Sequence, residues 1–409
     1  MIFGERSTPI LSLDSRLEVP YSLYLHIPFC GTRCSYCAFN TYTHVEALIP
    51  AYVAGLCREL SWLGTGQPVH TIYFGGGTPS LLSPSQVADI LAACQRAFDV
   101  PPDVEITLEA NPGSIGDDYL GRLRETGVNR LSVGMQSAHA QELKLFARQH
   151  DVDDVARTIS AARRAGFDNL NLDLIYGVPY QTLDMWRVSV EAALALGPDH
   201  LSLYALGLEA GTPLAKWVER GWLPAPDDDL AADMYDLADS LVCQAGLSQY
   251  EISNWARPGF ACRHNLQYWR NQPYLGLGAG AHGYVAGIRY EVVRPIQRYI
   301  DLAMQPVDAA PLPFPLTPTV EHHERIDDAG AMAEHMLTGL RLVEEGVSAE
   351  GFRQRFGVPI QDVYGEQLDW LTRYDLLRQD GDRLRLTARA RLLSNQVFLR
   401  FITNLNSSI

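Results

Sequence analysis

The chain has 409 residues, of which 47% are hydrophobic and 20% are charged, and its formal net charge at pH 7 is −15. This composition is typical of a soluble globular protein with room for two domains, and the acidity argues against a polyanionic partner such as tRNA, because phosphate binding needs a basic surface. No segment approaches the roughly 18 apolar residues of a membrane span, and the N-terminus lacks the apolar core of a signal peptide. The seven cysteines, an odd number, do not suggest a disulfide framework. We therefore expect a cytoplasmic protein without a transmembrane segment and without a nucleic-acid partner.

Short β-type runs alternate with helical patterns through the first half of the chain. The expected strands are 22–27, 71–74, 104–109, 130–134, 169–175 and 200–206. The expected helices are 46–63, 83–98, 117–126, 151–165 and 182–196. Repeated strand–helix units predict a parallel sheet with crossover helices, and six units are too few for a closed barrel of eight. The expected fold class is therefore α/β, with a partial, open (β/α)6 barrel resembling part of a TIM barrel.

The second half of the chain changes character. A segment dense in glycine and aromatic residues covers 249–284, and the Pro-rich stretch 308–321 is typical of a linker. Beyond it the pattern predicts helices over 334–346, 362–377 and 391–402, and a hairpin over 377–388 with its turn at Asp380-Gly381. We expect two domains, a barrel with the aromatic segment over 1–300 and a smaller, mostly helical, winged-helix-like domain over 301–409.

Three cysteines follow the first expected strand within "CGTRCSYC" (30–37), and they are Cys30, Cys34 and Cys37. The spacing C-x3-C-x2-C lets three thiols of one short loop ligate three corners of an iron–sulfur cube. Two alternatives remain, namely three unrelated buried thiols and a zinc site with His26 or His44 as fourth ligand. The other helical cysteines, Cys57, Cys94 and Cys243, lie in apolar patterns and are expected in the core.

These residues carry a family resemblance. "CGTRCSYC" matches the cluster-binding signature of the radical S-adenosylmethionine (SAM) superfamily, and the chain resembles its coproporphyrinogen dehydrogenase branch, HemN and its HemW relatives. The motifs that fit are "YLHIPFC" (24–30), "GGGTPS" (75–80), "LEANPG" (108–113), "SVGMQS" (132–137), "NLDLIYGVP" (171–179) and "CRHNLQYW" (262–269). The resemblance implies a [4Fe–4S] cluster on the three cysteines, with its fourth iron bound by the amino and carboxylate groups of SAM.

The resemblance also implies a SAM site. Its residues would be Tyr24, the backbone of Tyr36, Gly76, Gly77, Thr78, Glu109, Gln136, Arg148, Asp173 and Ala205. The pattern agrees independently, because these motifs follow strands, and chemistry in such barrels lies at the carboxyl ends of the strands. A carboxylate in an apolar strand is costly to bury unless paired, so Asp173 is a better site candidate than Asp168, which is expected in solvent. The alternative for Arg148 is a surface residue.

The chain departs from the oxidases of that branch at two places. Competent coproporphyrinogen dehydrogenases carry a cysteine where this chain has Phe39, and a longer extension before the first strand. Both departures match the HemW group, whose members resemble haem chaperones. We therefore expect a protein that binds the cluster, SAM and haem and delivers haem to an acceptor protein, with a respiratory protein as one candidate. The alternatives are an oxygen-independent coproporphyrinogen III oxidase, which decarboxylates propionates through a 5′-deoxyadenosyl radical, and a tRNA-modifying radical enzyme, which the acidity disfavours.

The segment "HNLQYW" (264–269) is the expected haem site. It places an imidazole beside amphipathic aromatic residues, which suits axial ligation and stacking on a porphyrin face. His264 is the expected iron ligand, and the Cys262 thiolate is its rival. The alternative is that this aromatic-rich segment packs between domains.

Overall fold

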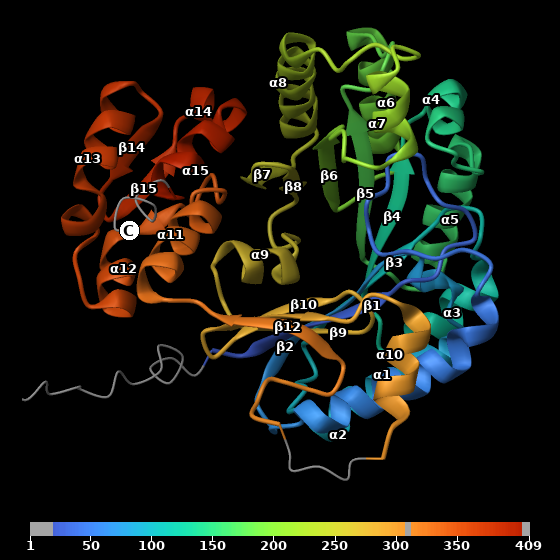
Figure 1. Ribbon diagram of the computed structural model, residues 1–409. Coiled ribbons are helices and arrows are strands. Elements are labelled where there is room, and N and C mark those ends of the chain that lie inside the picture. Colours follow the sequence, from blue (N-terminus) through green and yellow to red (C-terminus); the bar gives the residue numbers. More distant parts are fainter. Residues whose placement is uncertain (1–18, 307–311, 403–409) are drawn as a thin grey trace, which may run out of the picture.

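The computed structural model describes residues 19–306 and 312–402 (Figure 1). The first 18 residues and part of the expected linker over 308–321 lie outside this range. The six expected strands of the first half are confirmed. They are β1 (Tyr21–Ile27), β2 (Val69–Gly76), β3 (Glu105–Ala110), β4 (Arg130–Gln136), β5 (Asn169–Tyr176) and β6 (His200–Ala205). Each pairs in parallel with the next in chain order.

Helices follow these strands and cover the outer face of the sheet. They are α1 (Ile49–Leu63), α2 (Pro84–Ala97), α3 (Asp117–Glu125), α4 (Ala140–Leu145), α5 (Val152–Arg164) and α6 (Leu183–Ala195), followed by α7 (Pro213–Glu219) and α8 (Asp228–Gln244). Short 3-10 turns, η2 (Glu46–Leu48) and η3 (Pro79–Leu81), precede α1 and α2. At the start of α2, the Ser83 hydroxyl accepts the backbone N–H of Gln86, and the Gln86 side chain accepts that of Ser83. This reciprocal cap explains why the helix begins where the sequence predicts.

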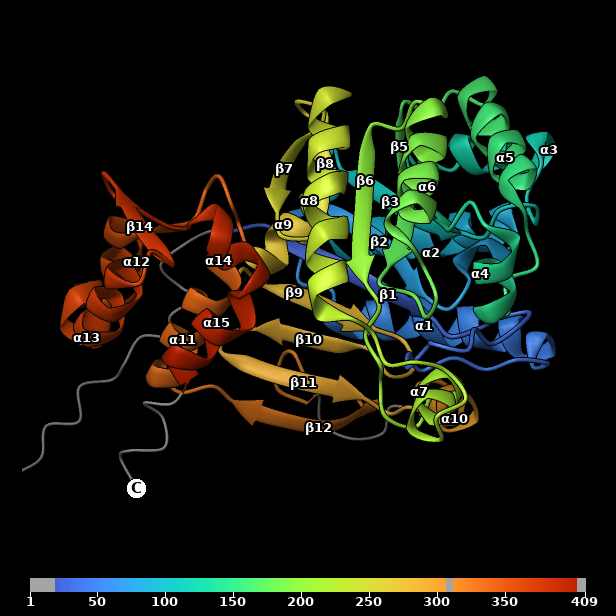
Figure 2. The same cartoon turned by 90° about the horizontal axis from the view of Figure 1, so that it is seen from above.

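The sheet continues on both sides of the six parallel strands and leaves the barrel open. Beyond β1 come β9 (Tyr274–Leu277), β10 (His282–Val285), β11 (Ile288–Val292) and β12 (Val320–Arg325), and beyond β6 come β8 (Asn254–Ala256) and β7 (Ser248–Glu251). Among the described residues these strands form one sheet of twelve in the order β12-β11-β10-β9-β1-β2-β3-β4-β5-β6-β8-β7. Figure 2 shows β9 to β12 extending the sheet away from β1. Because β1 and β6 do not pair, the predicted open barrel is confirmed.

A buried carboxylate fastens this extension to the barrel. Glu59 of α1 accepts hydrogen bonds from the backbone N–H of Gly278 (2.9 Å), the hydroxyl of Tyr299 (2.7 Å) and the hydroxyl of Thr319. Tyr299 belongs to α10 (Ile296–Met304), which packs on α1. Burial raises the pKa of Glu59, so these donors compensate the cost of removing a carboxylate from water.

The C-terminal part of the chain has a hydrophobic core of its own, which includes Met336, Phe352 and Phe401. Its elements are α11 (Asp328–Gly339), β13 (Val347–Ser348), α12 (Ala349–Phe356), α13 (Ile360–Arg373), β14 (Leu377–Asp380), β15 (Arg383–Leu386), α14 (Ala388–Leu392) and α15 (Ser394–Ile402). The predicted hairpin is confirmed, but the helix expected over 334–346 begins and ends earlier, and that over 391–402 is two helices. Since β12 belongs to the large sheet, we propose the domain boundary between β12 and α11, later than residue 300.

Two sequence-based assignments outside the site need comment. Cys94 is fully buried and Cys57 partly buried in the core, but Cys243 is exposed on α8, so that prediction was wrong. Helix α8 turns this position to solvent, whereas the preceding Val242 is buried. Asp168 is exposed just before β5, as predicted. No helix in the described part of the chain is long and apolar enough to cross a membrane.

Candidate functional site

A cavity of about 620 Å³ opens at the carboxyl ends of the parallel strands. Most of the expected site residues line it, namely Cys30, Cys34, Cys37, Tyr36, Gly76, Gly77, Thr78, Glu109, Gln136, Arg148, Asp173 and Ala205. Tyr24 and His264 do not. Tyr24 lies behind the wall, where its hydroxyl contacts His26 Nδ1 at 3.0 Å and its ring stacks on Tyr73. The strands therefore bring together groups that are far apart in sequence, as parallel strands with a common carboxyl edge must.

The cysteine loop leaves β1 and is held in place by backbone hydrogen bonds. The Cys30 N–H donates to the Tyr42 carbonyl (2.9 Å), and the Tyr42 N–H donates to the Pro28 carbonyl (2.8 Å). Further along, Ser35 donates through its N–H to Phe146 O (3.2 Å) and through its hydroxyl to Leu145 O (2.7 Å). Both ends of the loop are thus fixed to other elements, which limits the movement of the backbone that carries the thiols.

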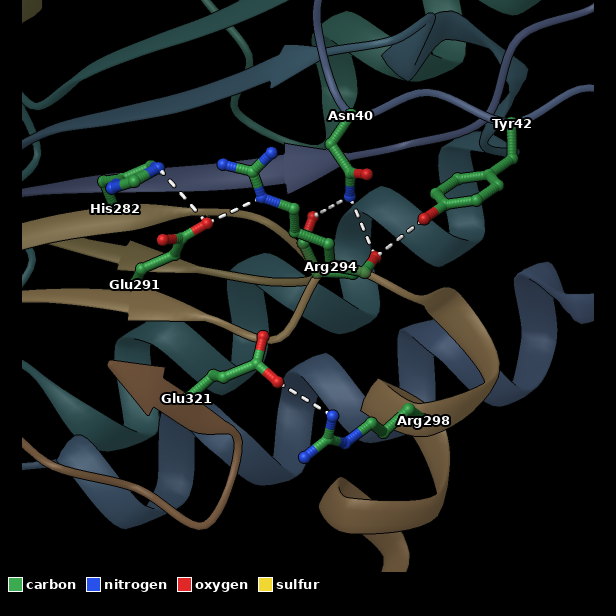
Figure 3. A network of polar contacts seen from close by, with 8 residues as sticks. Asn40, Tyr42, His282, Glu291, Arg294, Arg298 and Glu321 are labelled. Carbon is green, nitrogen blue, oxygen red and sulfur yellow. Dashed lines mark hydrogen bonds and ion pairs between the residues drawn. The ribbon is translucent and has the colours of Figure 1, made fainter. Parts of the chain in front are cut away.

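The end of the loop is also tied to the sheet extension (Figure 3). The Asn40 side-chain amide donates to the carbonyls of Ala279 and Arg294, both at 2.9 Å, and the Tyr42 hydroxyl donates to the Arg294 carbonyl at 3.1 Å. The Arg294 guanidinium itself pairs with Glu291 (2.7 Å). The loop that carries the cysteines is therefore held by the connections between elements of the sheet extension, more than two hundred residues later in the chain.

The histidines proposed for a zinc site are not available to the thiols. The imidazole of His26 contacts Tyr24 through Nδ1 and the Asn40 carbonyl through Nε2, both at 3.0 Å. His44 is exposed and does not line the cavity. Neither candidate fourth ligand is in position, so the zinc alternative loses its support.

Burial raises the pKa of the Cys30 and Cys37 thiols. Both thiols therefore resist ionisation until a metal or another cation approaches. A bound iron would reverse this balance, because coordination deprotonates a thiol.

The glycines after β2 let the backbone approach the cysteine loop closely. A Cβ on Gly77 would lie 2.6 Å from the Phe29 carbonyl oxygen and 2.7 Å from that of Ile27. The Gly77 N–H donates to that Ile27 carbonyl at 2.9 Å, which leaves no room for a side chain. Gly76 has a φ of 108°, a conformation that L side chains rarely adopt. The cavity wall requires both glycines at these positions.

A carboxylate at the end of β3 faces the same wall. The Tyr73 hydroxyl donates to Glu109 Oε1 (2.8 Å), and the Gly76 N–H donates to Oε2 (3.1 Å). Burial, partly offset by the Tyr73 bond, raises the pKa of Glu109 to about 7, and the nearby carboxylate of Asp173 adds to the rise. Glu109 therefore changes charge near neutral pH.

A chain of hydrogen bonds crosses the cavity from the glycine loop to the cysteine loop. Asn111 donates to the Thr78 hydroxyl (3.1 Å) and accepts from Arg148 Nη1 (2.7 Å), while Arg148 Nη2 donates to the Tyr36 hydroxyl (2.8 Å). Arg148 is thus not a surface residue. Its Nε has no hydrogen-bond partner among the described residues, although the atom is buried.

Polar residues of β4 and β5 complete the wall. Asp173 accepts from the Ser132 hydroxyl (3.0 Å) and from the Asn171 amide (2.8 Å). Burial raises the pKa of Asp173. At the end of β4, Gln136 has a φ of 64°, which is uncommon for a residue other than glycine and frequent at functional sites.

Among the lining residues that were not selected from the sequence, two have a clear role in the cavity wall. Asn111 lies in the quoted motif "LEANPG", but its link to Arg148 joins distant loops. Arg130 begins β4, lines the cavity and is almost fully buried, and its buried Nε has no hydrogen-bond partner among the described residues. The signal that could have found it is a guanidinium in an otherwise apolar strand, which is costly unless the charge is used.

The two residues proposed for haem lie beneath the cavity, on or just before α9 (Arg263–Trp269). His264 contacts the Thr71 hydroxyl through Nδ1 and the Tyr268 hydroxyl through Nε2, both at 2.8 Å. Cys262 is fully buried near Glu105, and burial raises the pKa of its thiol to about 12. Axial ligation by His264 would require one of its two bonds to break, and ligation by Cys262 would require its thiol to be uncovered.

Comparisons with known proteins place this geometry in a family. The profile of the Radical SAM superfamily matches residues 24–193, and that of the HemN C-terminal domain matches residues 326–393. The haem chaperone HemW of Lactococcus lactis is 37% identical over 94% of this chain and 98% of its own length. The haem chaperone HemW of Mycobacterium tuberculosis is 38% identical, over 97% and 98%. The chain belongs to the HemW family of radical SAM proteins.

The fold of this HemW family member is also that of a solved relative. The coproporphyrinogen III oxidase HemN of Escherichia coli superposes with a TM-score of 0.80 over 96% of this chain and 92% of that one, at 23% identity. At that identity the likeness establishes the architecture alone. The second profile match begins at the boundary between β12 and α11.

Membership of the radical SAM superfamily implies a [4Fe–4S] cluster and SAM. The types of donor suit both groups, although in the described part of the chain no three His, Cys, Asp or Glu side chains are already grouped so that they could hold a metal ion. Three thiols of one loop face the cavity without the fourth protein ligand of a closed site. Beside them lie carboxylates, amide groups and the buried, incompletely paired guanidinium of Arg148, which suit the amino, carboxylate and ribose groups of SAM.

Proposed function

We propose that this protein is a haem chaperone, which binds haem and delivers it to an acceptor protein, and which holds a [4Fe–4S] cluster and SAM. The observation that carries the proposal is the similarity to haem chaperones named HemW over nearly the full length of both chains. Because these matches span barrel and C-terminal unit alike, the proposal applies to the whole chain and not to a shared barrel alone.

Within this function the chain's residues would divide the work of holding two cofactors. We assign the cluster to Cys30, Cys34 and Cys37. The proposed SAM contacts are the backbone of Tyr36, Gly76, Gly77, Thr78, Glu109, Gln136, Arg148, Asp173 and Ala205, with Tyr24 supporting the wall from behind. When both cofactors are bound, the cluster would supply the electron for reductive chemistry on SAM. The fixed loops orient the thiols, and the glycine wall brings backbone groups against the ligand.

The alternative is an oxygen-independent coproporphyrinogen III oxidase, and one residue argues against it. In the resemblance to that branch, Phe39 stands where competent oxidases have a cysteine. The Phe39 side chain lines the mouth of the cavity and is 66% exposed, so the mouth presents an apolar ring where those oxidases have a thiol. We therefore expect no coproporphyrinogen turnover.

The deciding experiment combines two assays on the anaerobically reconstituted protein. A haem titration followed at the Soret band should show saturable binding. Incubation with coproporphyrinogen, SAM and a reductant should yield no protoporphyrinogen. Steady production of protoporphyrinogen would make the chain an oxidase, and absence of haem binding would remove the chaperone proposal.

A further inference from the structure

Helix α9 forms the floor beneath the cavity and is fixed to the strand above it. The two carboxylate oxygens of Glu105 on β3 accept the backbone N–H groups of Arg263 (3.0 Å) and His264 (3.1 Å) at the start of the helix. The next residue, Asn265, lines the cavity. The helix is thus part of the cavity wall, although its sequence suggests a haem site.

The imidazole of His264 has no free nitrogen in this arrangement. It is 1% exposed, its two ring nitrogens contact the hydroxyls of Thr71 and Tyr268, and its ring stacks on Tyr73 with centroids 4.9 Å apart. Burial lowers the pKa of His264 to about 3, so the ring is neutral, with one nitrogen donating and one accepting. An axial haem ligand needs an accessible lone pair on one nitrogen, and the contacts with Thr71 and Tyr268 occupy both nitrogens.

The stacked tyrosine leads directly to the proposed SAM site. Tyr73 donates its hydroxyl to Glu109 Oε1 at 2.8 Å, and Glu109 also accepts the Gly76 N–H. The imidazole of His264 covers one face of the Tyr73 ring and thereby fixes the direction of its hydroxyl. A displaced Tyr73 ring would lose its bond to Glu109, and the carboxylate would be free to turn away from the cavity.

We propose that His264 is a positioning residue of the SAM cavity, which acts through Tyr73 on Glu109, and not an axial ligand of haem. The inference rests on the proposed binding of SAM and haem, but it assigns the "HNLQYW" segment to the SAM site. Haem binding then has its determinants elsewhere in the chain.

Three variants test this role on the reconstituted full chain. His264→Ala removes the stack and both hydrogen bonds, His264→Phe keeps the stack alone, and Tyr73→Phe removes the bond to Glu109. We expect His264→Ala and Tyr73→Phe each to raise the dissociation constant of SAM about tenfold, the equivalent of about 1.4 kcal/mol. His264→Phe should have a smaller effect. The double variant His264→Ala/Tyr73→Phe should bind SAM no more weakly than either single variant, because both substitutions act on the same contact, the bond from Tyr73 to Glu109.

The pH profile of SAM binding separates positioning from a general loss of structure. The Tyr73 bond lowers the pKa of Glu109, and so does Arg130, while Asp173 raises it. Loss of the aligned bond should therefore move the midpoint of the profile to higher pH in His264→Ala and in Tyr73→Phe. A variant that only loosens the fold would bind less SAM at every pH without moving the midpoint.

The matched control is His335→Ala, which removes a second largely buried imidazole, one that packs on Phe352 and Phe356 in the C-terminal unit. It should leave SAM binding unchanged. Haem titrations run in parallel should give the parental Soret band for all His264 variants. A lost or shifted Soret band in His264→Phe, with SAM binding as in the parent, would overturn the inference. Failure of the parent itself to bind haem would instead refute the chaperone proposal, and the SAM measurements would still decide the role of His264.

Discussion

Polar side chains at the floor of the barrel interior have more complete hydrogen bonding than those at its mouth. At the floor, the carboxylate of Glu105 accepts two backbone N–H groups, and both nitrogens of His264 have hydroxyl partners. At the mouth, three thiols and the incompletely paired Arg148 face an open cavity. Polar groups that are committed to the fold specify a shape, whereas polar groups left facing a cavity are available to a ligand. The imidazole of His264, in the conspicuous "HNLQYW" motif, is one of the groups committed to the fold.

The contrast between mouth and floor would be wrong if the cysteines at the mouth were not needed for the cluster. Replacing Cys30, Cys34 or Cys37 by Ser should reduce the iron content of the reconstituted protein from about four atoms per chain to almost none, because each thiol holds one corner of the cluster. Iron analysis and the brown colour provide the measurement. Cys243→Ser, on the exposed face of α8, is the control and should keep the cluster. A fully loaded Cys34→Ser protein would contradict the assignment.

The glycine wall can be tested within the same part of the molecule. Gly77→Ala places a Cβ against two carbonyl oxygens at 2.6 and 2.7 Å. The backbone must shift, and we expect the free energy of unfolding to fall by about 2 kcal/mol together with SAM affinity. Gly31→Ala is a matched control, since nothing lies within 4 Å of a Cβ there. Equal thermal unfolding curves for both variants would show that the wall tolerates a side chain.

The charge of Glu109 provides a further test of the mouth, because this carboxylate titrates near neutral pH. Its pKa is raised to about 7, so the group is ionised above that pH and becomes neutral below it. SAM carries a sulfonium and an ammonium group, and its affinity should therefore fall several-fold as pH decreases from 8 to 6. Glu109→Gln should bind weakly and lose this dependence. Equilibrium binding at a series of pH values checks both, and an equally steep profile in Glu109→Gln would assign the titration to another group.

The smallest expected effect concerns the ties of the cysteine loop in Figure 3. Asn40→Ala removes two donors and leaves the carbonyls of Ala279 and Arg294 without this partner, which should cost about 1–2 kcal/mol of stability and speed cluster loss to a chelator. Tyr42→Phe removes one exposed hydrogen bond and should cost less than half as much. Thermal unfolding and the rate of bleaching measure the two. An order of effects opposite to this one would mean that Asn40 does not hold the loop.

Local patterns were sufficient for the barrel and for much of the mouth. Each parallel strand is a short apolar run, so that a carboxylate within it or at its end is conspicuous, and the family resemblance assigned Glu109 and Asp173 to the SAM site. Asn111 was missed because its partners, Thr78 and Arg148, lie on loops far away in the sequence. Arg130 was missed because its burial near Glu105 and Cys262 appears only in the folded chain. Strands β9 and β10 were missed because they lie within or at the end of the segment 249–284, whose glycine and aromatic residues suggest an irregular structure, and β11 lies beyond that segment, where no element was predicted.

The "HNLQYW" segment could not be interpreted from its sequence for a more general reason. A histidine beside Tyr268 has the same composition whether its ring covers a porphyrin or covers another tyrosine. The deciding fact is the position of Tyr73 and Thr71, two residues of β2 that lie far away in the chain. Of the two possibilities left open for this segment, the packed one agrees with the burial of His264.

The two edges of the twelve-stranded sheet have consequences for handling the protein. At the β7 edge, Glu251 forms a bridge with Leu342, and the Val343 N–H donates to the Tyr250 carbonyl (3.1 Å), so the C-terminal unit covers that edge. At the β12 edge, the exposed residues are charged or histidine, which discourages another strand from pairing there. A barrel cut away from its C-terminal unit would expose unpaired backbone groups along β7, without such charged protection. We therefore expect truncated chains to self-associate through that edge, which the C-terminal unit covers in the full chain.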